Sequence, residues 1–107
     1  MSGLFEEMAG LDRLVHEPAR LAILTALAAC QRADFVFLQR ITGLTVGNLS
    51  SHLSKLEEGG LVQVEKQFVG RRPNTLVQLT ESGRRAVAAH WQQLEALRKS
   101  ASEWKPD

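Results

Sequence analysis

The sequence has little cysteine and no long hydrophobic run, and each absence excludes a class of protein. Among 107 residues there is one cysteine, Cys30, so an internal disulfide is excluded and a reducing cytosol suits the chain. No stretch of about 18 apolar residues occurs, which argues against a membrane-spanning helix. The N-terminus lacks the basic segment of a signal peptide. We therefore expect a cytoplasmic protein without a membrane partner.

The motifs of common enzymes and metal sites are also missing. There is no glycine-rich nucleotide-binding motif and no nucleophile elbow. His16, His52 and His90 are far apart, and neither CxxC nor HxxxH spacing occurs. We predict no enzyme activity, no cofactor and no metal site. Cys30 ends an alanine-rich segment, where a buried structural thiol is the more frequent role and a redox switch the rarer one.

The charge of the chain is nearly balanced, but its distribution is uneven. Thirteen basic and twelve acidic residues leave a net charge of +1, which neither requires nor excludes a nucleic-acid partner. Residues 1–30 have a net charge of −2, whereas residues 31–80 carry six basic and four acidic side chains, a net charge of +2. Four of those six bases fall in a helical segment or at a hairpin tip. The excess is small and is typical of a solvated surface, and only the placement of these bases favours a nucleic-acid partner.

Apolar spacing and capping residues predict three helices in the first third of the chain. The first covers residues 4–15, and the second covers residues 18–30 and begins with a proline. The third covers residues 35–42, where Asp34 is suited to cap its start and Gly43 its end.

The next predicted helix, residues 46–58, has two contrasting faces. Thr45 is its expected N-cap. One arc of the helical wheel is apolar and should pack in the core: Val46, Leu49, Leu53 and Leu56. The opposite arc is small and polar: Gly47, Asn48, Ser51, Ser54 and Lys55. A helix that needed only solubility would carry more Glu and Lys there. Short polar side chains let a backbone approach another surface closely while offering donors and acceptors.

After Gly60 the apolar period changes from that of a helix to that of a strand. The alternating apolar positions are Val62, Val64, Phe68, Val77 and Leu79. The segment GRRPN interrupts them with Gly, Pro and Asn, which are turn residues. We therefore predict a β-hairpin with Arg71 and Arg72 at its tip.

Three segments carry a resemblance to a known family: HEPARLAILTAL, FLQRITGLTVGNLSSHLSKLEEGGLV and FVGRRPNTLVQLTESGRRA. The blocks GNLSSHLSKLEEGGLV and LTESGRRA are the most specific. The chain resembles the small winged helix-turn-helix transcriptional regulators of the MarR and ArsR groups over nearly its whole length. This implies a mainly α fold with a small β-hairpin. It also implies one domain over residues 1–107, with a core at about 18–80 between flanking helices at about 4–15 and 81–102.

The resemblance also implies a dimer that binds double-stranded DNA as a repressor or activator. The metal-sensing ArsR proteins carry cysteines on or near the helix-turn-helix, and this chain has none there, so metal sensing is not implied.

The predicted DNA contacts follow from the chemistry of the duplex. The major groove is about 12 Å wide and admits a helix, on which Asn48 suits adenine and Lys55 suits guanine or phosphate. Thr45 opens a helix N-terminus, which attracts phosphate. Arg71 and Arg72 suit the backbone or a narrow minor groove. His52, on the flank of its helix, is expected to have a structural or phosphate-contacting role. The predicted DNA-binding residues are Gln39, Arg40, Thr45, Gly47, Asn48, Ser50, Ser51, Ser54, Lys55, Arg71 and Arg72.

Apolar stripes at both ends of the chain exceed what the predicted core can cover, and they predict a twofold homodimer. Thr80 is suited to cap the C-terminal helix, and Trp91 and Trp104 add large apolar surfaces. Two recognition helices would then lie roughly 34 Å apart, one DNA turn. The predicted interface residues are Leu4, Met8, Leu11, Val15, Val87, Trp91, Leu94 and Leu97. A monomer with its terminal helices folded back is the alternative.

Two other functions stay open at this level. One is a winged-helix protein-interaction module that does not bind DNA, which the near-neutral charge allows. The other is a sensor with a small-molecule effector between the terminal helices and the core, although no convergent polar cluster supports a named ligand.

Overall fold

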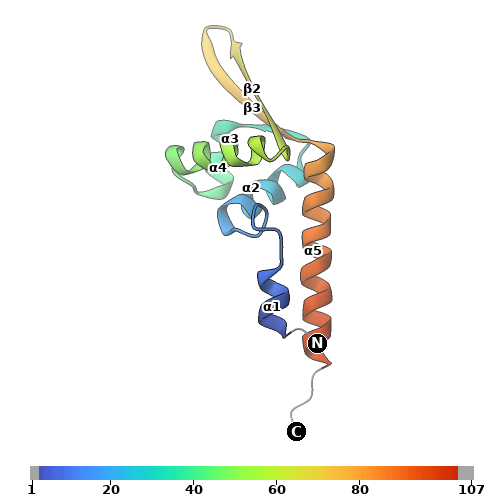
Figure 1. Cartoon of the computed structure of the whole chain (residues 1–107). Helices are drawn as coiled ribbons and strands as arrows, with labels where there is room; N and C mark the ends of the chain where they lie inside the picture. Colours follow the sequence, from blue (N-terminus) through green and yellow to red (C-terminus); the bar gives the residue numbers. More distant parts are fainter. Residues whose placement is uncertain (1–2, 104–107) are drawn as a thin grey trace.

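The computed structural model describes residues 3–103 and shows an elongated molecule of 67 × 25 × 21 Å. A hairpin projects from one side of a helical core, and a helical arm projects from the other (Figure 1). The elements in chain order are α1 (Leu4–Ala9), α2 (Pro18–Ala29), β1 (Arg32–Asp34), α3 (Phe35–Thr42), α4 (Val46–Glu58), β2 (Val62–Val69), β3 (Arg72–Leu79) and α5 (Glu81–Ser102). The predicted mainly α fold with a small β-hairpin is confirmed. None of the described helices is both long and apolar enough to cross a membrane.

The predicted helix caps form where the sequence placed them. The side chains of Asp34, Thr45 and Thr80 each accept a hydrogen bond from the backbone N–H three residues ahead, at 2.7, 3.1 and 3.0 Å. Glu17 caps α2 in the same way at 2.8 Å. Gly43 ends α3 with a φ of 75°, a backbone conformation that favours glycine. Of these capping residues, Gly43 and Thr45 lie in the turn that joins α3 to α4.

The sheet has three strands in the order β1-β3-β2, one strand more than predicted. The sequence suggested only a short break after α2, but Arg32–Asp34 pairs antiparallel with Leu76–Gln78. A strand of three residues has too few positions to show an alternating pattern, so it can be recognised only from its pairing with β3.

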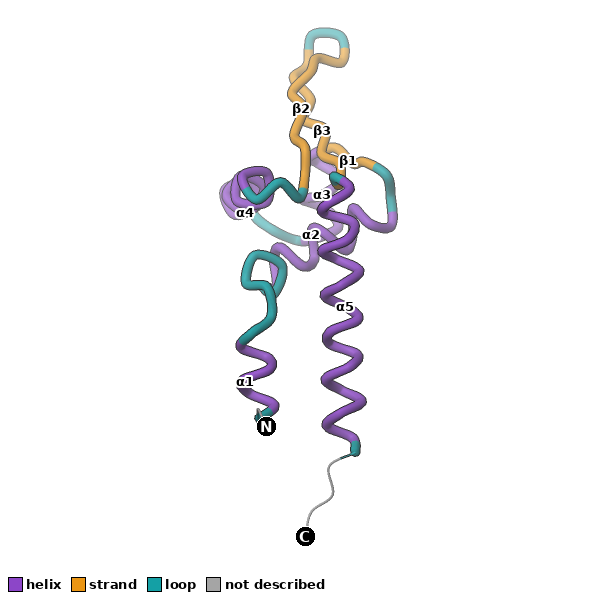
Figure 2. The backbone as a smooth tube through the Cα atoms, turned by 45° about the vertical axis from the view of Figure 1, so that its right-hand side comes forward, coloured by secondary structure: helices purple, strands orange, loops and turns teal. Residues whose placement is uncertain are grey.

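The hairpin is longer and its turn tighter than the GRRPN break suggested. Strands β2 and β3 pair without interruption from Val62–Leu79 to Val69–Arg72, which leaves two residues in the turn. Gly70, the first of these, has a φ of 65°. A two-residue turn that fits the right-handed twist of the strands requires such a conformation at its first position. The segment from Arg72 to Asn74 therefore belongs to β3, and the far half of the hairpin extends beyond the helices (Figure 2).

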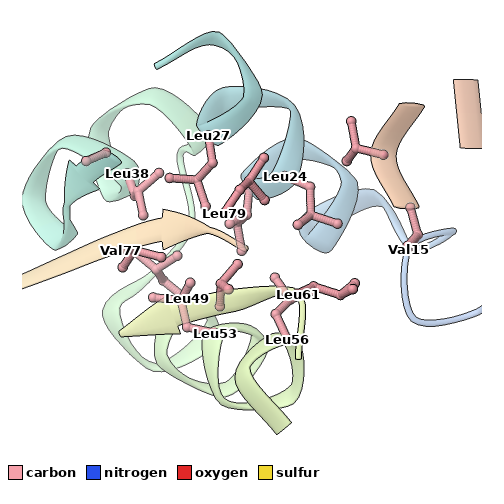
Figure 3. Close-up of a cluster of buried hydrophobic side chains, with 14 residues drawn as sticks. Val15, Leu24, Leu27, Leu38, Leu49, Leu53, Leu56, Leu61, Val77 and Leu79 are labelled. Carbon is pink, nitrogen blue, oxygen red and sulfur yellow. The ribbon is translucent and has the colours of Figure 1, made fainter. Parts of the chain in front are cut away.

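The core lies between α2, α3, α4 and the base of the hairpin (Figure 3). Leu49, Leu53 and Leu56 of α4 are buried in it, as predicted. The expectation for Val46 is wrong, because this side chain is 56% exposed. A helical wheel treats a helix as endless, whereas the first turn of α4 begins beyond the edge of the core.

The first helix is shorter than predicted. Helix α1 ends at Ala9 with Gly10 as its C-cap, and residues 11–17 form turns that lead into α2. Glycine is a poor helix former, and the turns let apolar side chains fold inward. Leu11, Val15 and Val87 are buried within the protomer, Val15 completely at 0% exposure. Their predicted place in a dimer interface is therefore wrong.

Candidate nucleic-acid interface

The polar face of α4 stands open to solvent above buried leucines. Leu49 and Leu56 are fully buried, whereas every residue predicted for DNA contact on this helix is exposed: Gly47, Asn48, Ser50, Ser51, Ser54 and Lys55. The helix is thus held firmly from one side by the core. Its other side offers an amide, three hydroxyls and one positive charge. The donors and acceptors needed to contact base edges are therefore present on a rigid element.

The start of α4 provides a second set of donors. Thr45 is exposed, and its hydroxyl oxygen accepts the N–H of Asn48 at 3.1 Å. The hydroxyl hydrogen is left for another acceptor, and the first N–H groups of the helix have no intrahelical partner. The positive end of the helix dipole is at the same place. This combination suits a phosphate oxygen.

Gly47 has no partner inside the protein that requires a glycine. A Cβ atom built at this position meets no atom of the described residues within 4 Å. Glycine in a helix costs up to about 1 kcal/mol relative to alanine, so its presence here lowers stability without helping internal packing. The exposed backbone at Gly47 fits the close approach of an outside surface.

The residues predicted on α3 differ in accessibility. Gln39 is half-buried and Arg40 is exposed. Helix α3 leads into α4 through Gly43 and Thr45. Arg40 is thus the better placed of the two to contact DNA backbone beside α4.

A groove of about 400 Å³ separates α4 from the hairpin. Ser50 and Ser54 line its helix side, and Val64, Lys66 and Thr75 line its hairpin side. Lys66 is absent from the predicted contacts. Strand alternation already places Lys66 on the same face of the hairpin as Val64. Only the structure shows that this face lies across the groove from α4.

The base of the hairpin is tied to the end of α4. The carboxylate of Glu57 accepts the backbone N–H of Val64 at 3.1 Å. The acidic pair Glu57 and Glu58 thus lies at the C-terminal end of α4, away from the positive N-terminal end of the helix. Phosphate contact is favoured at the start of α4 and disfavoured at its end.

The far half of the hairpin, residues 66–75, is called the wing here. Arg71 lies in the turn and Arg72 begins β3, and both are exposed. Together with Lys66 they make the wing positively charged, with no acidic residue between positions 66 and 75. The two arginines are therefore at the tip, as predicted, although one belongs to a strand.

The flank of α4 is linked to the turns before α2. The guanidinium of Arg20 donates to two backbone carbonyls there at 2.7 and 3.0 Å, and it lies 3.3 Å from Nδ1 of His52. His52 is also 3.8 Å from the Glu17 carboxylate. Burial raises the pKa of Glu17, but the N–H groups of Arg20 and Ala19 outweigh it and hold the pKa below its usual value. His52 thus has structural contacts.

A second histidine contact joins these turns to α5. His90 is 1% exposed, and its Nε2 lies 3.3 Å from Nδ1 of His16. Its Nδ1 has no hydrogen-bond partner among residues 3–103. Burial lowers the pKa of His90, and the neighbouring His16 lowers it further. A neutral His90 therefore helps to hold α5 against the core.

The arm consists of α1 and the part of α5 beside it (Figures 1 and 2). Of the predicted dimer residues, Met8 and Trp91 are exposed, and Leu4, Leu94 and Leu97 are half-buried. Phe5, which was not predicted, is among the most exposed apolar side chains. Trp104 lies outside the described residues.

The family of winged helix DNA-binding domains matches residues 19–98 of this chain. An uncharacterized protein of Methanocaldococcus jannaschii is 32% identical over 88 residues, which cover 82% of this chain and 96% of that protein. The structure of a transcriptional regulator homologue from Pyrococcus horikoshii OT3 is similar with a TM-score of 0.80 at 33% identity, over 92% of this chain and 95% of that one. A MarR family regulator from Silicibacter pomeroyi shares the fold, with a TM-score of 0.67 at 24% identity, over 96% of this chain and 66% of its own.

The family match covers well over half of the chain and includes the core, α4 and the hairpin. The arrangement of those elements agrees with the solved structures. This chain belongs to the family of winged helix DNA-binding domains and has the fold of MarR-like transcriptional regulators.

Proposed function

We propose that this protein is a sequence-specific regulator of transcription that places α4 in the major groove of double-stranded DNA. One observation carries the proposal: the Asn/Ser face of α4 is exposed along its length while the leucines behind it are buried. Family membership and the similarity to a transcriptional regulator homologue support it.

The exposed groups divide into two kinds of contact. Asn48 suits bidentate pairing with adenine, and Ser51 and Ser54 suit single hydrogen bonds to several bases. Thr45, Arg40 and the cations of the wing suit phosphate, which fixes register without reading sequence. The backbone at Gly47 lets the helix approach closely. In this proposal Asn48 supplies specificity and the cations supply affinity.

The proposal also includes a twofold homodimer that forms through the arm. Phe5 and Met8 are exposed on α1, and Trp91 is 47% exposed on α5. Helix α1 has no buried residue within the protomer. A second copy would cover these exposed side chains and present two recognition helices about one DNA turn apart, which favours a palindromic site.

The test measures binding of labelled duplexes by fluorescence anisotropy at two salt concentrations, after enrichment from a randomised pool. We expect tighter binding at low salt, and Asn48→Ala should relax selection at one base position, worth about 1–3 kcal/mol. Gln31→Ala is the matched control, since Gln31 is exposed and belongs to neither α4 nor the wing. Absence of salt-dependent binding by the unaltered protein would replace this function with a protein-interaction role.

A further inference from the structure

The wing carries an apolar tip that the fold does not cover. Phe68 is 73% exposed and its neighbour Val69 is 61% exposed. The inner part of the same hairpin buries Val62, Val77 and Leu79 in the core. The outer part lies past the helices, so its apolar side chains contribute little to that core. Single exposed apolar residues are common, but a phenylalanine this exposed at a basic tip calls for a partner surface.

The register of the hairpin decides which way Phe68 faces. Phe68 is opposite Pro73, and the next pair on the same face is Lys66 with Thr75. Lys66 and Thr75 line the groove beside α4. The Phe68–Pro73 pair therefore extends that groove outward along the wing, whereas Val69 lies on the opposite face.

The distance along the wing matches the spacing of DNA grooves. Phe68 follows Val64 by four residues, which at about 3.4 Å per residue is about 14 Å. Half of the roughly 34 Å turn of duplex DNA is about 17 Å, and this separates a major groove from the next minor groove. If α4 occupies the major groove, Phe68 is thus far enough along the wing to approach the neighbouring minor groove.

We propose that Phe68, backed by Pro73, inserts into the minor groove of DNA as an apolar wedge held in place by Arg71 and Arg72. The inference rests on the proposed function and adds a contact to it. Apolar side chains from minor-groove proteins pack on sugars and between base steps, where they partly unstack the duplex. Pro73 stiffens the support because its φ is fixed. The adjacent cations favour a polyanion over a second copy of this chain as the occupant.

The first experiment separates the wedge from the charges beside it. Phe68→Ala should weaken binding to the pool-enriched duplex about tenfold, the scale of burying one large apolar side chain. The slope of log affinity against log salt should stay unchanged, because the variant keeps every cation. Val69→Ala is the matched control, one residue away on the opposite face, and should bind as the unaltered protein does.

The second experiment does not depend on loss of binding. Phe68→Trp keeps an aromatic ring at the tip, and its fluorescence should be quenched on addition of duplex as the indole contacts the bases. Val69→Trp should show much less quenching. The signal of the unaltered protein supplies the background from Trp91 and Trp104. Thermal melts of each variant show whether the fold is intact.

The outcomes distinguish this inference from the function beneath it. Normal duplex binding by Phe68→Ala, together with an unquenched Trp at position 68, overturns the wedge and leaves the regulator intact. A shift of Phe68→Ala from dimer to monomer by sedimentation overturns the wedge in favour of a contact between copies. Lack of duplex binding by the unaltered protein overturns both proposals.

Discussion

The two ends of this elongated molecule project from the same core and carry opposite surfaces. The wing end has Lys66, Arg71 and Arg72 with no acidic residue among residues 66–75. The arm end exposes Phe5 and Met8 on α1 beside Glu6 and Glu7, and the adjoining part of α5 carries an exposed Glu95–Arg98 ion pair. Neither end is covered by the protomer. The difference agrees with the proposal made above, in which the wing contacts a polyanion and the arm contacts a second copy of the chain.

The largest effect is expected at the joint between the two ends. Gly83 lies where α5 starts beside the hairpin, and a Cβ there would meet the backbone oxygen of Leu61 closely. Because backbone must move to admit a methyl group, Gly83→Ala should lower the free energy of unfolding by about 3 kcal/mol. Denaturant unfolding measures it. A variant of unchanged stability would mean that the ends are not joined through this contact.

A change confined to the arm comes next. Phe5→Glu places a charge at an exposed apolar position of α1 and should weaken the proposed dimer by about 2 kcal/mol or more, roughly thirtyfold in Kd. The fold of the protomer should be unaffected, since Phe5 is outside the core. Analytical ultracentrifugation measures the dimer, with Glu6→Gln as the control. An unchanged dimer would remove α1 from the interface.

A change confined to the wing should leave the dimer intact. Replacing Arg71 and Arg72 by alanine together should weaken binding to all duplexes about tenfold at moderate salt. It should also flatten the salt slope by about 0.9 for each phosphate that the arginines no longer neutralise. Salt titrations of DNA binding measure both effects. If the salt slope of the double variant stayed the same while its dimer dissociated, the wing would be assigned to the dimer interface and the arm to DNA.

The contact between α5 and the turns before α2 should also respond to pH, because His90 faces His16 there and is influenced by the charge of Asp12. The pKa of His90 is lowered in the fold, so below the ordinary value of 6.5 the unfolded chain binds more protons than the folded one. Stability is therefore full above about pH 6.5 and falls as pH drops below it, by at most about 1.4 kcal/mol per pH unit.

Denaturant unfolding between pH 5 and pH 7.5 measures this loss, and His90→Leu should reduce the slope. His52→Gln is the control for a histidine in another contact. If the free energy of unfolding depends on pH as strongly in His90→Leu as in the unaltered protein, other titratable groups cause the dependence.

The smallest effect concerns the surface between the two ends. Gly47→Ala should raise the free energy of unfolding by about 0.5–1 kcal/mol, since the added methyl group meets open space and alanine favours a helix. The same change should weaken DNA binding, because the helix can no longer approach as closely. Higher stability in a thermal melt together with weaker DNA binding in a titration would support the role of Gly47. Equal or tighter binding would contradict it.

The sequence was most informative where the interaction is local. Asp34, Thr45 and Thr80 cap their helices through bonds to residues three positions ahead, so composition and spacing suffice to predict them. The exposed face of α4 was predicted for the same reason, since helical periodicity separates Leu49 from Asn48 without tertiary contacts. The residues of α4 in the candidate site could therefore be named from the sequence.

Prediction failed where a distant partner decides the structure. Strand β1 exists because β3 lies beside it, and Lys66 enters the candidate site because α4 lies across a groove. Val15 looked like part of an exposed stripe, but Gly10 ends α1 and the following turns carry the side chain into the core. Periodicity cannot report such events, because it assumes that an element continues.

The sequence by itself determined helices α2 to α5, their N-terminal caps, the polar face of α4 and the basic tip of the hairpin, because each depends on residues within a few positions of one another. Only the tertiary structure decided that the apolar stripes near the chain ends divide into buried and exposed members, and that Phe68 lies outside the core on the face shared with α4. Burial depends on where a strand or helix leaves the packed interior, and that point is set by contacts between segments far apart in the chain.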